Sequence, residues 1–446
     1  MESQWFVARL HDRSIRGLSR QVAALIQSGT LPVGTHLPPI RELAFALGVS
    51  PATVSIAWGE LRRRNLIEGR GRSGMFVTGT SIVPHPTRRT ASVGLSKTSF
   101  DLTSYTPDLS LLPRLDGAFS LVRQTPNLNT YEDETITAAL RTIASDTWPY
   151  TPEDFMACNG GYGGVHDVMH ALIPPGSLVA VEDPAPMRVL DILDHLSALI
   201  VPVRSDNDGP VPDSLRVALA RGATAFYLQP GLNAITGRAI SAKRAAELGA
   251  VMSDAPATWI IEDDALSGLS DQTAASLGLW RPEQTIHVRS LSKSLGPDLR
   301  IGVISASARI IRELQAFRSF GAGWTSRLLQ SAAAWMLTDT ETCATVARAR
   351  RVYGERRRAL ADALANHGVN VGDGGGFSLW LPVANEADAL AILASDGIRV
   401  TGGKKCSVGG APHIRLSFSR LTSDQSWLAS RLVCAGLRSD GAEQTL

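Results

Sequence analysis

The sequence predicts two folded units, an N-terminal winged helix-turn-helix of the α+β class and a larger α/β domain that has a mainly parallel sheet and a smaller C-terminal lobe. Short helical patterns fill the segment from about Ile15 to Thr78, whereas apolar strand-like runs alternate with helical stretches from about Phe100 onward. A length of 446 residues also exceeds what one hydrophobic core usually supports. We therefore expect a winged domain over residues 1–79, a linker over 80–99 and a large domain over 100–446, with a small lobe over about 338–446.

Composition narrows the class of protein. Hydrophobic residues at 44% and charged residues at 19% are ordinary values for a folded chain. The N-terminus carries charges where a signal peptide needs an apolar core, and no run approaches the roughly 18 apolar residues of a membrane span, so we expect a cytoplasmic protein. The cysteines are scattered without a Cys-x-x-Cys pair, which predicts reduced thiols, no disulfide framework and no metal site; they are Cys158, Cys343, Cys406 and Cys434.

Positive charge is concentrated near the N-terminus. From Asp12 to Gly79 the chain has nine arginines, no lysine and four acidic residues, a net charge of +5 within a total of +2. A basic segment attached to a near-neutral body predicts an anionic partner for that segment alone.

Three helices and a wing are predicted in this basic segment. "LSRQVAALIQSG" and "PPIRELAFALG" both end on glycine, and "SPATVSIAWGELRRRNL" opens with a serine cap followed by proline. The turn "GVSP" between the second and third helices has the length of a helix-turn-helix, which makes the third helix the recognition helix. "LIEGRGRSGMFVTG" then predicts two short strands around a glycine-rich tip. "GRGRSG" also matches the dinucleotide-binding pattern, but a strand-like segment follows it where that pattern requires a helix.

This segment resembles the winged helix domain of the GntR family in the run "LPPIRELAFALGVSPATVSIAWGELRRRNLIEGRGRSGMFV". The resemblance implies double-stranded DNA as the partner. The implied DNA contacts are Arg41, Ser50, Thr53 and Ser55, together with Arg70, Arg72 and Gly74 in the wing. Pro51 and Ala52 depart from the family, which often has arginine and a polar residue after the turn.

The string "HVRSLSKSLGPDLRIG" carries the most informative chemistry of the large domain. It follows a predicted strand and combines Lys293 with the hydroxyls of Ser290 and Ser292 and with Arg300 seven residues later. A lysine amine can form a Schiff base, while hydroxyls and an arginine can hold a phosphate dianion. These are the parts of an anchor for pyridoxal 5'-phosphate.

Two further segments supply what such an anchor needs. "WIIEDD" places Asp263 at the end of an apolar strand, where a carboxylate can keep a pyridinium nitrogen protonated. "CNGGYGGVHDVM" places Gly160 and Gly161 before a helix, whose N-terminal amides can take phosphate oxygens.

Together these segments resemble the aminotransferase class I fold, which is fold type I of the pyridoxal phosphate enzymes, over nearly all of residues 100–446. By that resemblance Lys293 is the Schiff-base lysine, Asp263 the pyridine partner, and Arg300, Ser290 and Gly161 phosphate binders. Tyr131 is a tyrosine that reaches the phosphate of the partner subunit, and Arg415 an arginine that clamps a substrate carboxylate. A GntR-type reader fused to this domain is the layout of the MocR-like regulators, which implies a homodimer that binds two half-sites.

Three departures from the aminotransferase pattern bear on activity. Ala234 stands where the family has asparagine, with Asn233 one place off. Ala265 and Leu266 stand where a tyrosine is usual, and Pro186 replaces an aromatic residue. By the resemblance, these side chains hold the phenolate oxygen of the cofactor and stack on its ring. Their loss favours sensing over turnover, because proton transfer in transamination needs a firmly held cofactor.

Three functions remain open from the sequence. The first is a transcription regulator that senses a small amino compound, or the B6 vitamer itself, through pyridoxal phosphate. The second is an aminotransferase with an accessory DNA-binding module. The third is a regulator whose pocket has lost the cofactor and binds another metabolite.

Overall fold

The computed structural model describes residues 3–27, 29–69, 74–78, 86, 88, 100–122, 125–131, 134–270, 275–421 and 425–437. The chain divides into two compact units, Met1–Pro86 and Thr87–Leu446. Of the expected linker over 80–99, the structure describes only Pro86 and Arg88. Among the described residues, no single helix has the length and apolar character to cross a membrane, and α3 with α4 passes that test only as a pair bent by 117°.

The N-terminal unit is a helical domain with a small antiparallel sheet of order β1-β3-β2. It contains α1 (Ser3–Val7), α2 (Ile15–Gln27), β1 (His36–Leu37), α3 (Ile40–Leu47), α4 (Pro51–Arg63), β2 (Ile67–Gly69) and β3 (Met75–Val77). The three predicted helices and the two wing strands are confirmed, whereas α1 and β1 were not predicted. Trp58, Leu61 and Val22 lie in one buried core that fixes α4 against α2.

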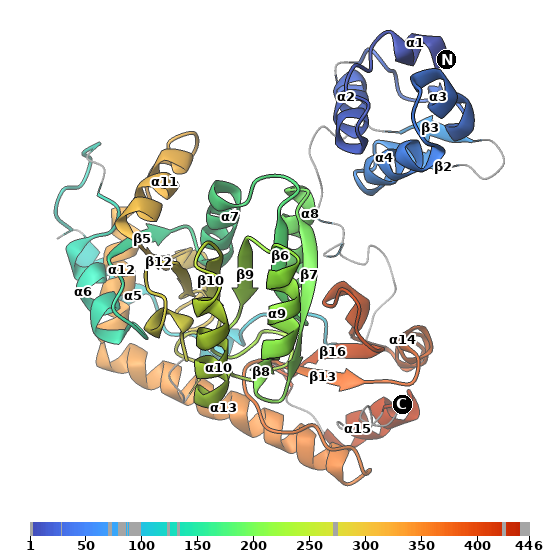
Figure 1. Cartoon of the computed structure of the whole chain (residues 1–446). Helices are drawn as coiled ribbons and strands as arrows, with labels where there is room; N and C mark the ends of the chain where they lie inside the picture. Colours follow the sequence, from blue (N-terminus) through green and yellow to red (C-terminus); the bar gives the residue numbers. More distant parts are fainter. Residues whose placement is uncertain are drawn as a thin grey trace. The chain divides into compact units, whose positions relative to one another are not determined.

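The large sheet of the second unit has eight strands in the order β5-β12-β11-β10-β9-β6-β7-β8 (Figure 1). The pairs β11–β10, β10–β9, β9–β6 and β6–β7 are parallel, and β12 and β8 run antiparallel to their neighbours. The predicted mainly parallel sheet is therefore confirmed. Its strands are β5 (Asp154–Cys158), β6 (Leu178–Asp183), β7 (Leu199–Asp206), β8 (Gly209–Pro210), β9 (Ala225–Leu228), β10 (Trp259–Asp264), β11 (Thr285–Ser290) and β12 (Gly302–Ala306).

Helices cover both faces of this sheet, which makes a three-layer α/β domain. One face packs on α7 (Gly161–Leu172), α8 (Met187–His195) and α11 (Ala308–Arg318). The other packs on α5 (Asp116–Leu121), α6 (Ala138–Thr147), α9 (Pro212–Ala220), α10 (Ala242–Ser253) and α12 (Arg327–Thr338). The parallel strands are buried from both sides and read as continuous apolar runs for that reason.

A smaller lobe follows the 26-residue helix α13 (Thr340–Ala365). It contains β13 (Ser378–Pro382), α14 (Glu386–Ser395), β14 (Ile398–Arg399), β15 (Thr401–Gly402), β16 (His413–Ser417) and α15 (Gln425–Cys434). β4 (Phe100–Asp101) pairs with β14, and Leu102 lies in the core of this lobe. The start of the large domain therefore belongs to the small lobe, which the sequence did not indicate.

Candidate functional site

Two neighbouring parallel strands bring the predicted anchor residues to one edge of the sheet. Asp263 on β10 pairs with Val288 on β11, and Ser290 and Lys293 follow Val288 at the end of β11. Side chains alternate along a strand, so Asp263 and Ile261 share the face covered by α7. Ligands in open α/β sheets bind at this carboxyl edge.

Asp263 is buried and held by two hydrogen bonds. The Tyr227 hydroxyl donates to its Oδ2 at 2.8 Å, and the Gln229 side-chain amide donates to the same oxygen at 2.9 Å. Burial raises the pKa of Asp263 to about 6, although both hydrogen bonds favour the ionised form. The carboxylate is therefore fixed in orientation, and a pyridinium nitrogen beside it would favour its charged form.

The residues predicted to bind phosphate meet at the N-terminus of α7. A Cβ atom built on Gly160 would lie 2.9 Å from the Arg300 guanidinium, and one on Gly161 would lie 2.6 Å from the Cβ of Ser290. The Ser290 Cβ at Gly161 and the φ of 79° at Gly160 both favour glycine, which leaves helix N-terminal amides, a cation and a hydroxyl around one point. The buried Ser292 Oγ has no hydrogen-bond partner among the described residues. The residues present therefore fit pyridoxal phosphate.

Lys293 lies against a segment that the sequence did not connect to it. Its Nζ donates to the backbone oxygen of Tyr105 at 2.6 Å and lies 4.9 Å from the centre of the Tyr105 ring. Arg415 is buried beside the same segment and donates to the Thr103 backbone oxygen at 2.6 Å and to the Thr401 hydroxyl at 3.2 Å. Lysine and arginine are thus brought together by residues 103–105.

The residues that replace the family's phenolate partners have structural roles. Asn233 accepts hydrogen bonds from the amides of Ile235 and Thr236, so its side chain closes its own turn. The amide of Ala234 donates to the Gln229 side chain at 2.8 Å. Leu266 is buried in an apolar cluster with Phe377.

Tyr131 lies away from this cluster. Its side chain is 89% exposed and packs edge-on against Trp324 at a centroid distance of 5.7 Å. Within one chain it therefore does not reach the cofactor residues, and its role at a partner's phosphate stays a prediction.

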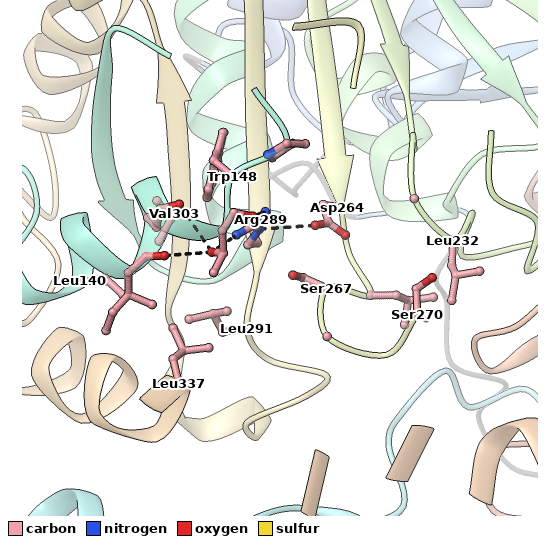
Figure 2. A pocket seen from close by; sticks show the side chains of 17 residues that line it. Leu140, Trp148, Leu232, Asp264, Ser267, Ser270, Arg289, Leu291, Val303 and Leu337 are labelled. Carbon is pink, nitrogen blue, oxygen red and sulfur yellow. Dashed lines mark hydrogen bonds and ion pairs between the residues drawn. The ribbon is translucent and has the colours of Figure 1, made fainter. Parts of the chain in front are cut away.

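A cavity of about 300 Å3 lies on the face of β10 and β11 that is opposite to the one covered by α7 (Figure 2). Its lining is mostly apolar and includes Leu140, Trp148, Leu291, Val303 and Leu337. Arg289 contributes a cation, but its guanidinium donates twice to Thr147 at 3.0 Å and lies 3.5 Å from Asp264. Asp264 and Asp263 are consecutive and point to opposite faces, so Asp264 and Arg289 line this cavity while Asp263 does not; Leu266 also belongs to its lining.

Four of the predicted DNA-contacting residues of the N-terminal unit lie at or near the start of two helices. Arg41 and Ser55 are exposed, on α3 and α4 respectively. Ser50 caps α4 by accepting from the Thr53 amide at 3.1 Å, and its hydroxyl lies 2.8 Å from that of Thr53. Gly74 has a φ of 86° beside His36, and Arg70 and Arg72 lie outside the described residues.

Sequence reasoning missed Tyr105, Tyr227 and Gln229. Tyr227 on β9 and Gln229 directly after it had a weak signal, because "FYLQP" places a tyrosine and a glutamine two positions apart at a strand end. Tyr105 had none, since it lies 188 positions before Lys293.

Both parts of the chain match known families. Residues 99–427 match "Aminotransferase class I and II", and residues 16–77 match "Bacterial regulatory proteins, gntR family". The vitamin B6 salvage pathway transcriptional repressor PtsJ of Salmonella typhimurium is 32% identical and matches 90% of this chain and 93% of its own. The probable rhizopine catabolism regulatory protein MocR of Rhizobium meliloti is 24% identical over 85% of this chain and 81% of its own.

Solved structures support the fold of the large domain. The kynurenine aminotransferase of Pyrococcus horikoshii superposes with a TM-score of 0.67 at 18% identity, over 75% of this chain and 90% of its own. The family match supports pyridoxal 5'-phosphate as the cofactor of this domain. The chain belongs to the aminotransferase class I and II family and, through its N-terminal GntR domain, is a MocR-like member of the GntR transcriptional regulators.

Proposed function

We propose that this chain is a pyridoxal phosphate-dependent transcription regulator, whose cofactor pocket senses a small molecule and whose winged domain binds an operator in the bacterial cytoplasm. The single observation that carries the proposal is the convergence of Lys293, Asp263 and the cradle around Gly161 in a chain that also has a GntR domain. When bound, the cofactor supplies an aldehyde that reacts with amines and an electron-withdrawing ring.

Each pocket residue has a definite task in this proposal. Lys293 anchors the cofactor through its amine, and Asp263 pairs with the pyridinium nitrogen through the oxygen that Tyr227 and Gln229 do not occupy. Ser290, Ser292, Arg300 and the first amides of α7 hold the phosphate. Arg415 faces the same pocket and offers a cation to an anionic effector.

The same pocket favours sensing over turnover. Leu266 and Ala234 offer no side-chain hydrogen-bond donor to a phenolate oxygen, and the Asn233 side chain is engaged in its own turn. The name of the Salmonella relative says that it represses the vitamin B6 salvage pathway. For the present chain we propose a B6 vitamer as one of the two effector classes that its chemistry allows.

A homodimer completes the proposal. Tyr131 and Phe320 are 89% and 94% exposed, which is costly for two aromatic side chains in water unless a second copy covers them. Two copies present two recognition helices to two half-sites of double-stranded DNA.

Absorbance titration of the purified protein with pyridoxal phosphate tests the cofactor, and Lys293→Ala tests its anchor. We expect a saturable visible absorbance band of the imine, which the wild type shows and Lys293→Ala lacks, and an adduct that borohydride fixes in the wild type alone. Lys243→Ala is the matched control, because Lys243 is exposed and paired with Glu247. A borohydride-stable adduct retained by Lys293→Ala refutes the anchor.

Fluorescence anisotropy with the DNA upstream of the gene tests regulation. We expect the cofactor to change the dissociation constant for this DNA by about 5- to 150-fold, the usual range of coupling between two sites. Steady turnover of an amino acid with a keto acid supports the accessory-module alternative instead. Absence of any cofactor band supports a repurposed pocket.

A further inference from the structure

Tyr105 lies against both cations of the cofactor pocket. The centre of its ring is 4.9 Å from the Lys293 amine and 5.6 Å from the central carbon of the Arg415 guanidinium. The Phe377 ring also packs against the Tyr105 ring, at a centroid distance of 5.4 Å. The ring is therefore a fixed part of the pocket wall.

The backbone around Tyr105 strengthens this arrangement. The Tyr105 carbonyl accepts from Lys293, and the Thr103 carbonyl accepts from Arg415, both at 2.6 Å. The backbone carbonyls of Thr103 and Tyr105 therefore provide hydrogen-bond acceptors for the arginine and the lysine. The Arg415 Nε and the Tyr105 hydroxyl are both buried, and neither has a hydrogen-bond partner among the described residues.

An α-amino acid bound to the cofactor needs the space that this ring takes. Its nitrogen would take the place of the Lys293 amine, and its carboxylate, attached to the same α-carbon, would reach Arg415 for a charge-assisted bond. Its α-carbon and side chain would then have to lie beside both cations, where the Tyr105 ring lies 4.9 Å from the Lys293 amine and 5.6 Å from the Arg415 guanidinium.

We infer that Tyr105 is a specificity-determining residue that excludes amino acids from the cofactor and restricts the effector to the B6 vitamer. The inference rests on the proposed function and selects one of its two effector classes. The vitamer's own binding groups come from other elements: Asp263 from β10, Ser290 from β11 and Gly161 from α7. The ring therefore blocks the amino-acid portion and leaves the binding groups for the pyridine and phosphate in place.

Two non-covalent probes that share the pyridoxamine 5'-phosphate group test the inference. The first is pyridoxamine 5'-phosphate itself, and the second is N-(5'-phosphopyridoxyl)-L-leucine, which carries the carbon atoms and carboxylate of leucine on the same nitrogen. Calorimetric titration of the cofactor-free full-length protein gives both dissociation constants. We expect the wild type to bind the leucine conjugate at least about tenfold more weakly, because one immovable ring in the way costs that much or more.

Substitution of Tyr105 separates its bulk from its hydroxyl. Tyr105→Ala is expected to abolish or reverse the preference, whereas Tyr105→Phe keeps the ring and the wild-type ratio. Arg415→Ala in the Tyr105→Ala background is expected to remove the gained affinity for the conjugate, because its carboxylate then has no cation. Thermal melts of each variant establish that it is folded.

The outcomes distinguish the inference from the function on which it rests. If the wild type binds both probes equally, Tyr105 moves aside and the inference is overturned, while cofactor sensing stands. If the wild type binds neither probe, the proposed function fails and the inference with it. The wild-type ratio alone is decisive even if Tyr105→Ala does not fold.

Discussion

Glu182 extends the hydrogen-bond network behind Asp263. It is 3% exposed, and its carboxylate accepts from the Gln229 backbone amide at 2.8 Å, while the Gln229 side chain donates to Asp263. Burial raises the pKa of Glu182 to about 8, because few partners replace the water that its charge has lost. At neutral pH the folded protein therefore keeps a proton on Glu182.

Glu182→Gln is expected to make folding stability less dependent on pH. The pKa of Glu182 rises from its usual 4.5 to about 8 on folding, so the folded state binds an extra proton between these values and loses stability as pH rises through them. The slope is at most about 1.4 kcal/mol per pH unit. The melting temperature of Glu182→Gln should match the wild type near pH 5 and exceed it increasingly up to pH 8.

An exposed glutamate provides the control for this measurement. Glu283 is 59% exposed and paired with Arg281, and Glu283→Gln should leave the difference from wild type constant across the range. A constant gap for Glu182→Gln as well contradicts a protonated Glu182.

Residues of the site could be predicted where their signal was local. Lys293, Asp263 and Ser290 stand at or just beyond the ends of apolar strands, and a few neighbouring letters are enough to assign them a role. The Tyr105 position depends on how a segment before the sheet folds back over its edge. No spacing in the sequence encodes that contact, so its part in the pocket emerged only from the fold.

At the scale of elements, regular periodicity decided what the sequence could predict. α2 and α4, with 13 residues each, are long enough to show a helical repeat, and both were predicted. β4 and β14 have two residues each, too few to show alternation, and they pair across nearly 300 positions. Such contacts follow from tertiary packing and leave no local pattern.

The turn between α3 and α4 shows how local chemistry fixes the recognition helix. Gly48 ends α3 with a φ of 67°, a left-handed conformation that glycine adopts without steric cost. Ser50 then caps α4 through the Thr53 amide, and Pro51 occupies the first helical position. The end of α3 and the start of α4 are thus fixed by Gly48, Ser50 and Pro51, which lie within four residues.

Ser50→Ala is expected to loosen the first turn of α4. Loss of a serine cap costs about 1 kcal/mol, which corresponds to roughly fivefold faster amide exchange where that turn opens locally. Hydrogen exchange with mass spectrometry on peptides covering 50–63 of the full-length protein measures this. Ser55→Ala is the control, because Ser55 is exposed and lies beyond the cap. This variant should weaken DNA binding without changing amide exchange. Faster exchange in Ser55→Ala contradicts the assignment of the cap to Ser50.

At the scale of the whole molecule, α8 connects the pocket to the segment that follows the winged domain. The turn before α8 meets the pocket through the Asn233 side-chain amide, which donates to the Pro184 carbonyl at 3.3 Å, and Pro186 stands where the family stacks an aromatic residue on the cofactor. Farther along α8, Asp191 accepts from the Arg88 backbone amide at 3.1 Å, and Asp194 pairs with the Arg88 guanidinium. A shift of this turn would therefore move the residues that hold Arg88.

Arg88→Ala is expected to uncouple the two functions without removing either. The variant should bind pyridoxal phosphate and, without it, bind DNA as the wild type does, but the cofactor-induced change in DNA affinity should shrink severalfold toward one. Anisotropy titrations with and without the cofactor measure this ratio. Arg216→Ala breaks a comparable arginine–aspartate pair with Asp213 on α9 and should leave the ratio unchanged. Coupling of wild-type size in Arg88→Ala excludes the contacts between Arg88 and α8 as the route.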